Sequence, residues 1–125
     1  MKILILDDDL QRHAGFKSLL SGHHLSHSFT YSEFVSALNS EEFDLVCLDY
    51  DLDIKHNPDT VLDRNGIRSL NGADVAAWIS ANPDKCPRDI LVHSMNPDGA
   101  EQIAEILRRI PGKNVVVKPY SVSKE

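Results

Sequence analysis

Short apolar runs alternate along the chain with segments of helical periodicity. The runs have the length of strands, the second being the weakest: 3–6, 25–29, 45–48, 90–92 and 115–117. Between them, apolar side chains recur every three or four positions over 10–20, 31–38, 72–81 and 97–110. This alternation predicts βαβ units and a parallel sheet, and the unbroken run 45–48 is typical of a central strand buried on both faces.

Turn and capping residues mark the ends of the predicted helices. Ser21-Gly22 ends the first helix and Asn82-Pro83 ends the third. Thr30-Tyr31-Ser32-Glu33 has the spacing of a capping box, in which two side chains accept hydrogen bonds from backbone N–H groups at the helix start. Asn96-Pro97 places a capping asparagine before a proline at the first helical position.

Two stretches depart from this regular pattern. Residues 50–71 contain Pro, Asn, Asp and Gly without a clear period. A connection between a strand and a helix usually takes about 2–6 residues, so we interpret this long one as a functional loop and a candidate substrate lid. Seven residues follow Lys118, and we expect no full closing helix there.

Composition limits the class of protein. At 125 residues the chain suits one domain, 1–125, and its 42% hydrophobic and 26% charged residues indicate a soluble globular protein. No apolar run approaches the ~20 residues of a membrane span. Cys47 and Cys86 form no metal-binding pair or disulfide framework, so a cytoplasmic location is expected. The net charge of −6 provides no overall attraction to nucleic acid.

Polar residues follow each predicted strand that could lie near the centre of the sheet. In an open parallel sheet, ligands bind beyond the carboxyl ends of the strands. The residues at those ends are Asp7, Asp8 and Asp9; Asp49 and Asp51; His93 and Ser94; and Lys118. Asp9 is also a good N-cap for the first helix.

Neighbouring strands would bring several of these carboxylates together. Close like charges raise one another's pKa unless a cation neutralises them, and Mg²⁺ prefers oxygen ligands of this kind. We therefore predict that Asp7, Asp8 and Asp49 bind Mg²⁺ or Mn²⁺. Lys118 and Ser94 suit phosphoryl oxygens, so the set fits phosphoryl transfer.

Histidines and arginines supply further candidates. His93 is interpreted either as a packed residue or as a general acid beside the phosphoryl group. In the long loop, His56, Arg64 and Arg68 could meet a phosphate ester, because a guanidinium binds phosphate with two parallel hydrogen bonds. The histidines around the first helix and second strand are interpreted as solvated surface residues: His13, His23, His24 and His27.

At this point the sequence resembles the response-regulator receiver family. The matching stretches are KILILDDD, FDLVCLD, ILVHS and VVVKPY, in that order. The resemblance implies a three-layer flavodoxin-like fold with a five-stranded parallel sheet in the order 2-1-3-4-5. It also implies roles by position: Asp7 and Asp8 as the acidic pair, Asp49 as phosphoacceptor, Ser94 as switch residue and Lys118 as the lysine before a proline. Asp51 would contribute a backbone carbonyl or side chain to Mg²⁺.

Several features differ from an ordinary receiver. The position of the aromatic switch residue is Val115, the closing helix is missing and the loop after Asp49 is expanded. With LDYDLD and HSMNPDGA, these features are similar to a receiver offshoot, the cyclic-phosphate-processing receiver-like domains. Haloacid-dehalogenase-type phosphatases and Toprim-like nucleases use similar D-x-D pieces, but they place their acidic residues on different strands.

Three hypotheses about function follow. The first is a metal-dependent phosphoesterase-like domain that acts on a phosphate ester of a nucleotide or RNA end, including cyclic esters. In this hypothesis the reaction takes place at Asp49, Lys118, Ser94 and His93, and the substrate is bound by Arg64 and Arg68. The second is a stand-alone phosphoacceptor in a phosphorelay, phosphorylated on Asp49 by a partner kinase. The third is a protein-binding module that keeps the pocket as a relic. The apolar face that the missing helix would uncover predicts a homodimer, unless the loop or the tail from Tyr120 onward covers it.

Overall fold

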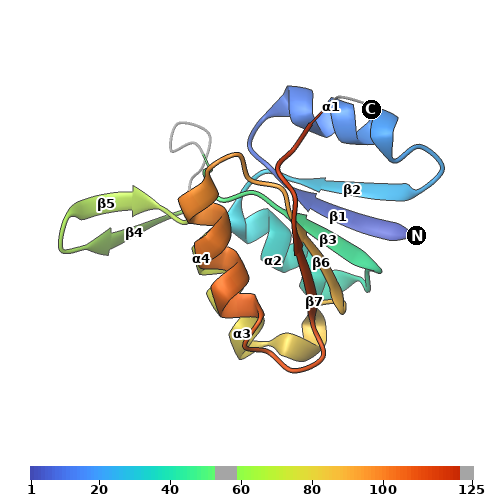
Figure 1. Cartoon of the computed structure of the whole chain (residues 1–125). Helices are drawn as coiled ribbons and strands as arrows, with labels where there is room; N and C mark the ends of the chain where they lie inside the picture. The colour runs from blue at the N-terminus through green and yellow to red at the C-terminus, as the bar shows by residue number, and fades with distance from the viewer. Residues whose placement is uncertain (53–58, 122–125) are drawn as a thin grey trace.

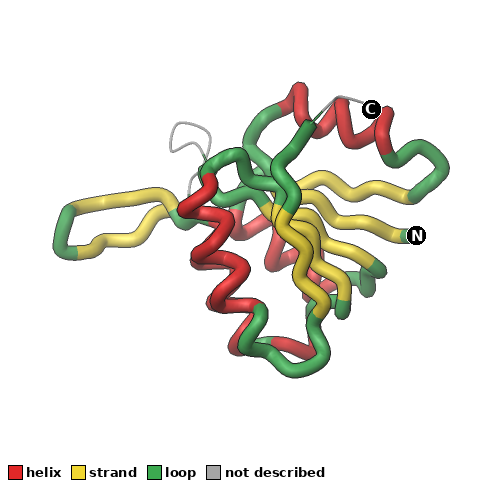
Figure 2. Tube along the Cα trace, in the orientation of Figure 1, coloured by secondary structure: helices red, strands yellow, loops and turns green. Residues whose placement is uncertain are grey.

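The computed structural model describes residues 1–52 and 59–121. The chain alternates strands with helices along its length, as Figures 1 and 2 show. The strands are β1 (Lys2–Leu6), β2 (His24–Ser28), β3 (Leu45–Leu48), β4 (Thr60–Asp63), β5 (Gly66–Ser69), β6 (Asp89–Val92) and β7 (Asn114–Val117); the helices are α1 (Leu10–Leu19), α2 (Tyr31–Ser40), α3 (Gly72–Ala81), the short 3₁₀ turn η2 (Pro83–Lys85) and α4 (Pro97–Leu107). Among these helices none is both long and apolar enough to cross a membrane.

Five strands form one parallel sheet in the order β2-β1-β3-β6-β7. With the two hairpin strands set aside, this is the predicted order 2-1-3-4-5, so the receiver-like fold is confirmed. The central strands end level with one another, because Leu6 is opposite Leu48 and Leu48 is opposite Val92. Backbone hydrogen bonds continue this register past the strand ends, from Asp49 N to Leu6 O and from His93 N to Leu48 O. The residues after each strand therefore meet at one edge of the sheet.

The two faces of the sheet are covered unequally. Helices α2, α3 and α4 cover one face, and the larger core lies there, around Phe34, Leu48 and Ile103. Helix α1 covers the other face, where Phe16 packs on Ile3, Ile5 and Cys47 in a smaller core. Both sides of β3 are thus buried, as its unbroken apolar sequence predicted.

The missing closing helix was predicted to leave part of one face of the sheet exposed, and this is the face that carries α1. Side chains alternate along β7: Val115 and Val117 pack into the larger core, while Val116 lies on the α1 side and is 47% exposed. Tyr120 packs edge-to-face on Phe16, with ring centroids 5.1 Å apart, so the described chain after β7 covers part of this face. An apolar groove of about 450 Å³ remains beside it.

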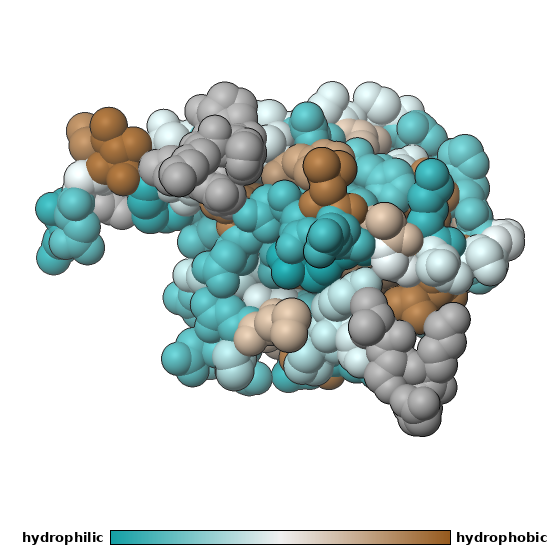
Figure 3. Space-filling view, turned by 90° about the horizontal axis from the view of Figure 1, so that it is seen from above, coloured by the Kyte–Doolittle hydropathy of each residue, from teal (hydrophilic) through white to brown (hydrophobic). Residues whose placement is uncertain are grey.

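The long connection after β3 contains a β-hairpin, which the sequence reading treated as a loop without regular structure. Strands β4 and β5 pair antiparallel, with Asp63 opposite Gly66 across a two-residue turn. The hairpin projects from the domain (Figure 1), and apolar surface covers part of the arm (Figure 3), where Leu62 and Ile67 are 76% and 69% exposed. Asn65-Gly66 is a hairpin signal that the sequence already carried: Arg64 and Asn65 make the turn, and Gly66 follows with the positive φ that glycine favours.

The predicted capping residues are present at the helix starts, with one change of partner. Thr30 Oγ1 accepts a hydrogen bond from Glu33 N at 3.2 Å, but Glu33 accepts its own from Phe29 N, one residue before the cap. Both hydrogen bonds of a capping box occur instead at α3, between Asn71 and Asp74.

Candidate metal centre

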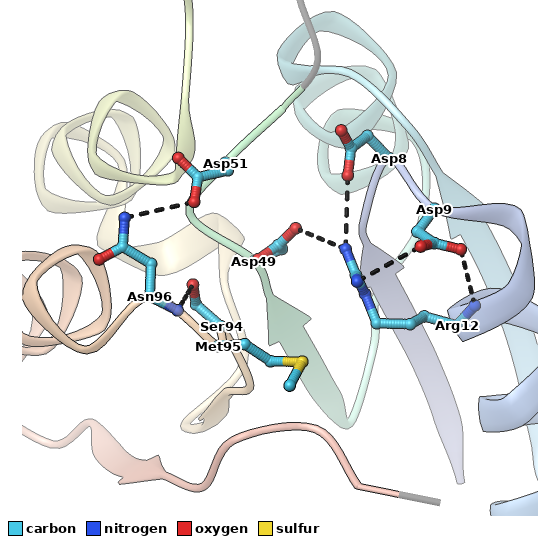
Figure 4. Close-up of a pocket in the computed structure, with 8 residues that line it drawn as sticks. All are labelled: Asp8, Asp9, Arg12, Asp49, Asp51, Ser94, Met95 and Asn96. Atoms are coloured by element: carbon cyan, nitrogen blue, oxygen red, sulfur yellow. Dashed lines mark hydrogen bonds and ion pairs between the residues drawn. The ribbon is translucent and has the colours of Figure 1, made fainter.

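A pocket of about 560 Å³ opens at the carboxyl end of the sheet. Residues from three separate segments line it, as Figure 4 shows. They are Asp8, Asp9 and Arg12 around the start of α1, Asp49 and Asp51 after β3, and Ser94, Met95 and Asn96 between β6 and α4. The level ends of the central strands bring these segments together.

Three carboxylates at this edge form a cluster. Asp7, Asp8 and Asp49 each offer one oxygen, and these oxygens lie within 4.8 Å of one another. Asp7 and Asp49 are buried, at 0% and 4% exposure, because they follow the two most buried strands. The convergence predicted from the strand ends is therefore present, with Asp7 lying below the residues that line the pocket.

Asp7 is held by hydrogen bonds to both of its carboxylate oxygens. His93 Nε2 donates to Oδ2 at 2.9 Å, and Asp9 N donates to Oδ1 at 2.9 Å. Burial alone would raise the pKa of Asp7, but the hydrogen bonds from His93 and then from Arg12 and Asp9 N lower it to about 2. Asp7 is accordingly a permanent negative charge inside the fold.

Arg12, in the first turn of α1, lies across the carboxylates (Figure 4). Its Nε donates to Asp7 Oδ2 at 2.8 Å, and its Nη2 donates to Asp7 Oδ1 at 2.9 Å. The same Nη2 lies 3.5 Å from Asp8 Oδ1 and 3.5 Å from Asp49 Oδ2, while Nη1 lies 3.4 Å from Asp9 Oδ2. The hydrogen bond to Asp7 is the largest cause of the raised pKa of Arg12.

Asp49 has the opposite electrostatic balance to Asp7. Its Oδ1 accepts one hydrogen bond, from Tyr50 N at 2.9 Å, and its Oδ2 faces Arg12. Burial and then the charge of Asp7 raise the pKa of Asp49 to about 7, against the lowering effects of Arg12 and the Tyr50 amide. The surrounding protein thus compensates the charge of Asp49 less well than that of Asp7.

The loop between β6 and α4 shapes the other wall of the pocket. Ser94 Oγ accepts a hydrogen bond from Asn96 N at 3.1 Å, so its hydroxyl hydrogen remains available to a ligand. Asn96 caps α4 through Gly99 N and donates from Nδ2 to Asp51 Oδ2 at 3.2 Å. Asp51 therefore lies in the pocket with its side chain turned toward Asn96 (Figure 4), outside the three-carboxylate cluster.

The structure brings some predicted site residues to other places. Lys118 is exposed and lines the apolar groove on the α1 side, and none of the described carboxylates forms an ion pair with it. Arg68 pairs with Asp74 at the start of α3 at 2.8 Å, and Arg64 lies in the hairpin turn. Neither arginine lines the carboxylate pocket. His56 lies outside the described residues.

The positions of two histidines, His13 and His93, bear on what the sequence predicted for them. The surface assignment of His13 is wrong: it is 4% exposed, and its Nε2 donates to the Asp7 carbonyl oxygen at 2.7 Å. Its Nδ1 lies 2.7 Å from Nδ1 of His27 on β2, which joins α1 to the sheet. His93 is 1% exposed, below Asp7 rather than in the pocket lining.

Arg12 is the site residue that the sequence reading missed. The available signal was its spacing, because a residue four positions after Asp8 in a first helical turn lies on the same side as Asp8. An arginine in a first turn is otherwise unremarkable, and only the fold shows that this turn starts directly above the carboxylates of β1 and β3.

The donor set of the cluster suits a hard divalent cation. Carboxylate oxygens are the ligands that Mg²⁺ and Mn²⁺ prefer. The guanidinium already lying across the cluster shows that the site accommodates positive charge. Burial and then the charge of Asp7 raise the pKa of Asp49, and a cation would favour its ionised form. Asp7, Asp8 and Asp49 are therefore the residues that would hold the ion.

Solved structures similar to the chain are response-regulator receivers. NtrX from Brucella abortus, crystallised in complex with ADP, is 22% identical with a TM-score of 0.64, covering 97% of this chain and 24% of that one. The NtrX receiver domain alone is 21% identical with a TM-score of 0.64, covering 96% of this chain and 88% of that one. TrrA from Thermotoga maritima, in complex with Mg²⁺ and BeF, is 16% identical with a TM-score of 0.65, covering 96% and 86%. The chain spans about a quarter of the longer NtrX chain, and these likenesses show the fold.

A family model described as "Cyclic-phosphate processing Receiver domain" matches residues 1–109. No curated protein matches the chain. The matched range includes the three clustered carboxylates, Arg12 and the Ser94 loop, and it excludes Lys118.

Proposed function

The chain belongs to the family of cyclic-phosphate processing receiver domains, and we propose that it is a metal-dependent phosphoryl-handling domain that processes a phosphate ester of a nucleotide or RNA end, cyclic esters first. The carrying observation is a set of three carboxylates whose oxygens lie within 4.8 Å of one another, two of which, Asp8 and Asp49, line a pocket of about 560 Å³. Pockets of roughly 300–1,000 Å³ hold small molecules of nucleotide size.

The charge of the pocket supports dependence on metal. Four carboxylates and one arginine line it, so an anionic phosphate ester would meet net negative charge. When bound, a divalent ion would neutralise the carboxylates and polarise a phosphoryl oxygen. The protein groups then have separate tasks at the ester.

Asp49 and Ser94 are the residues that we place at the reacting phosphorus. Asp49 Oδ1 is held by Tyr50 N, which leaves Oδ2 toward the pocket. Ser94 has a hydroxyl hydrogen to donate to a phosphoryl oxygen, and its position is fixed by Asn96 N. Lys118 ends β7 at the same edge of the sheet, and we propose that its side chain turns to the ester when ligand binds. His93 acts by holding Asp7.

A second candidate function uses the same aspartate. Asp49 ends β3 at a pocket that Ser94 shares, which also suits a phosphoacceptor that takes a phosphoryl group from a partner kinase or small phosphodonor. In that reaction Asp49 Oδ2 bonds to phosphorus, the bond from phosphorus to the donor's nitrogen or oxygen atom breaks, and that atom leaves with the donor while Asp49 becomes an aspartyl phosphate. Ester processing instead releases product and regenerates Asp49.

A turnover screen separates the two functions. The purified chain is incubated with cyclic and linear nucleotide phosphates and, separately, with acetyl phosphate, in the presence of Mg²⁺ or Mn²⁺. Multiple turnovers of a cyclic phosphate support the proposed function. Stoichiometric labelling by acetyl phosphate without ester turnover would support the phosphoacceptor function and contradict the proposed enzymatic function.

Matched variants connect the result to the pocket. Asp49→Asn keeps the shape of the side chain and removes its charge, so it should abolish turnover or labelling. Asp84→Asn makes the same change in η2, at the opposite end of the sheet, and should leave the signal unchanged. Full activity of Asp49→Asn would show that the Asp49 carboxylate takes no part in the reaction.

Substrate binding by Arg64 and Arg68 stays a prediction, and so does a homodimer. Arg68 would have to exchange Asp74 for a phosphate, and Arg64 would act only on a ligand that reaches the hairpin arm. A homodimer would bury the apolar groove on the α1 side, which Leu45, Leu91 and Tyr120 line.

A further inference from the structure

One nitrogen atom of Arg12 lies where the ion of the proposed function would bind. Nη2 is 2.9 Å from an oxygen of Asp7 and 3.5 Å from one oxygen each of Asp8 and Asp49. These three carboxylates form the cluster whose oxygens lie within 4.8 Å of one another. The guanidinium thus takes the place of a cation that all three residues share.

The hydrogen bonds of Asp7 make this arrangement exclusive. A carboxylate has about four lone-pair positions, and Asp7 uses them for four donors: Arg12 Nε, Arg12 Nη2, His93 Nε2 and Asp9 N. His93 Nε2 is the donor in its bond, because Asp7 is ionised and can only accept. Two of the four donors belong to Arg12, so Asp7 can offer an oxygen to a metal ion only after Arg12 withdraws.

Coordination distances lead to the same conclusion for Asp8 and Asp49. Mg²⁺ binds oxygen at about 2.0–2.1 Å in near-octahedral geometry. An ion that close to the carboxylates cannot share their pocket with a guanidinium nitrogen. We propose that Arg12 is a displaceable internal cation that competes with the divalent ion, an inference that rests on the proposed metal-dependent function.

The position of Arg12 allows this exchange. Its side chain is 26% exposed, against 0% for Asp7 and 6% for Asp49, and it lies on the pocket wall in the first turn of α1. Its contacts to Asp8, Asp9 and Asp49 are 3.4–3.5 Å long, so the two bonds to Asp7 hold it. Once withdrawn, the guanidinium stays at the pocket mouth, where it suits the phosphoryl oxygens of an ester.

Competition of this kind lowers the apparent affinity for metal. The measured affinity falls in proportion to the fraction of molecules in which Arg12 has withdrawn. Removing the guanidinium should therefore raise the affinity for Mg²⁺ by about tenfold or more, on the scale of one charge-assisted hydrogen bond.

Titration calorimetry with Mg²⁺ and Mn²⁺ tests this on the wild-type chain, Arg12→Gln and Arg88→Gln. Arg88 precedes β6 at the far end of the sheet, where it lies 3.7 Å from Asp89, so Arg88→Gln controls for net charge. We expect tighter binding by Arg12→Gln and wild-type affinity for Arg88→Gln. Equal or weaker binding by Arg12→Gln would overturn the competition and leave the metal site in place. Absence of binding in all three chains would overturn the proposed function itself.

A second measurement uses the wild-type chain alone, in case Arg12→Gln does not fold. The Nε–H of Arg12 is hydrogen-bonded to buried Asp7, so its NMR resonance should be protected from solvent exchange. We expect Mg²⁺ to abolish this protection in step with binding. A protected resonance that persists at saturating Mg²⁺ would contradict the displacement of Arg12.

Discussion

At the scale of single residues, Asp7 and Asp49 show how one cluster creates two different carboxylates. Four hydrogen bonds keep Asp7 ionised and lower its pKa to about 2. Asp49 is buried beside the charge of Asp7 and has fewer donors, so its pKa is raised to about 7. The negative charge of Asp49 is therefore the one that an ion or a phosphoryl group would relieve.

This difference predicts a pH effect on stability in a metal chelator. The folded-state pKa of Asp49 lies above its ordinary value of 3.8, so its stabilising contribution is present below about pH 4 and is lost as pH rises through about 7. Relative to Asp49→Asn, the wild type should lose on the order of 4 kcal/mol of unfolding free energy over that range. Urea unfolding of both chains at a series of pH values measures the difference.

The matched control is Asp84→Asn, whose unfolding free energy should follow the wild type across pH. If the unfolding free energies of the wild type and Asp49→Asn changed in parallel with pH, the pKa of Asp49 would not be raised in the folded protein. Saturating Mg²⁺ should shrink the difference between these two chains, because the ion supplies the missing positive charge.

The site was predictable from sequence to the extent that strand ends determine it. Asp7, Asp8 and Asp49 follow buried strands directly, so their convergence follows from sheet register. The charged groups of Arg12 and Lys118 were less predictable, because each lies several bonds from the backbone. The packing around a long side chain decides where its charged end lies. Sequence position placed Lys118 beside the site and gave no reason to place Arg12 there, yet the structure has Arg12 on the carboxylates.

At the scale of secondary-structure elements, α3 begins in direct contact with the end of β3. Gly72 N donates to Tyr50 O at 2.9 Å. A Cβ atom at Gly72 would meet the Asp49 carbonyl oxygen, and it would lie 2.9 Å from Tyr50 Cα. Only a glycine lets the helix approach the backbone that carries Asp49.

Gly72→Ala should therefore destabilise the domain by about 1–3 kcal/mol, because the contacted atoms belong to a buried backbone that cannot turn aside. It should also weaken Mg²⁺ binding, since Asp49 moves with its carbonyl. Thermal unfolding with and without Mg²⁺ measures both effects.

Gly15→Ala is the matched control, because it makes the same change inside α1. There the added methyl meets the hydroxyl end of Tyr120, a flexible side chain, and alanine favours the helix by about 1 kcal/mol. Its effect on unfolding free energy should stay within about 1 kcal/mol. A loss for Gly15→Ala as large as that for Gly72→Ala would contradict this account of the α3 contact.

Lys113 joins β7 to the segment before β6 through its ammonium group. Nζ donates to the carbonyl oxygens of Pro83 at 2.8 Å, Cys86 at 2.6 Å and Pro87 at 3.3 Å. Lys113→Met keeps the length of the side chain and removes these donors, so it should cost about 1–3 kcal/mol in urea unfolding. Lys85→Met, which removes an exposed bond to Asn39, should change stability by less than about 0.5 kcal/mol.

At this scale the sequence predicted the regular elements and missed the hairpin. Apolar runs located the central strands β1 and β3 most clearly, because burial on both faces leaves continuous apolar sequence. The edge strand β2 is mostly exposed or half-buried and gave the weakest signal. Strands β4 and β5 bury little, so their apolar residues form no such run, and only Asn65-Gly66 marks their turn.

At the scale of the whole molecule, the hairpin arm is separate from the sheet that forms the site. Its strands pair with each other and with no strand of the five-stranded sheet. Described contacts hold its base: Asp59 accepts hydrogen bonds from Ser32 N and Ser32 Oγ, and Arg68 pairs with Asp74. The arm is therefore an addition to a complete receiver-like sheet.

Replacing Thr60–Ser69 with a short Gly-Ser linker should leave a folded, Mg²⁺-binding domain. We expect cooperative unfolding and an undiminished response to Mg²⁺, because the carboxylates and the sheet lie outside the arm. Light scattering on both chains reports whether the exposed Leu62 and Ile67 cause association. Loss of cooperative unfolding would show that the arm is part of the core.

The central claim is that Asp7, Asp8 and Asp49 bind a divalent ion that the phosphoryl chemistry requires. Thermal unfolding in millimolar Mg²⁺ tests it most directly, on the wild type and on Asp8→Ala, which removes the most exposed carboxylate of the cluster. We expect Mg²⁺ to raise the melting temperature of the wild type and to have no effect on Asp8→Ala. A wild type that does not respond to Mg²⁺, or an equal rise in both chains, would contradict it.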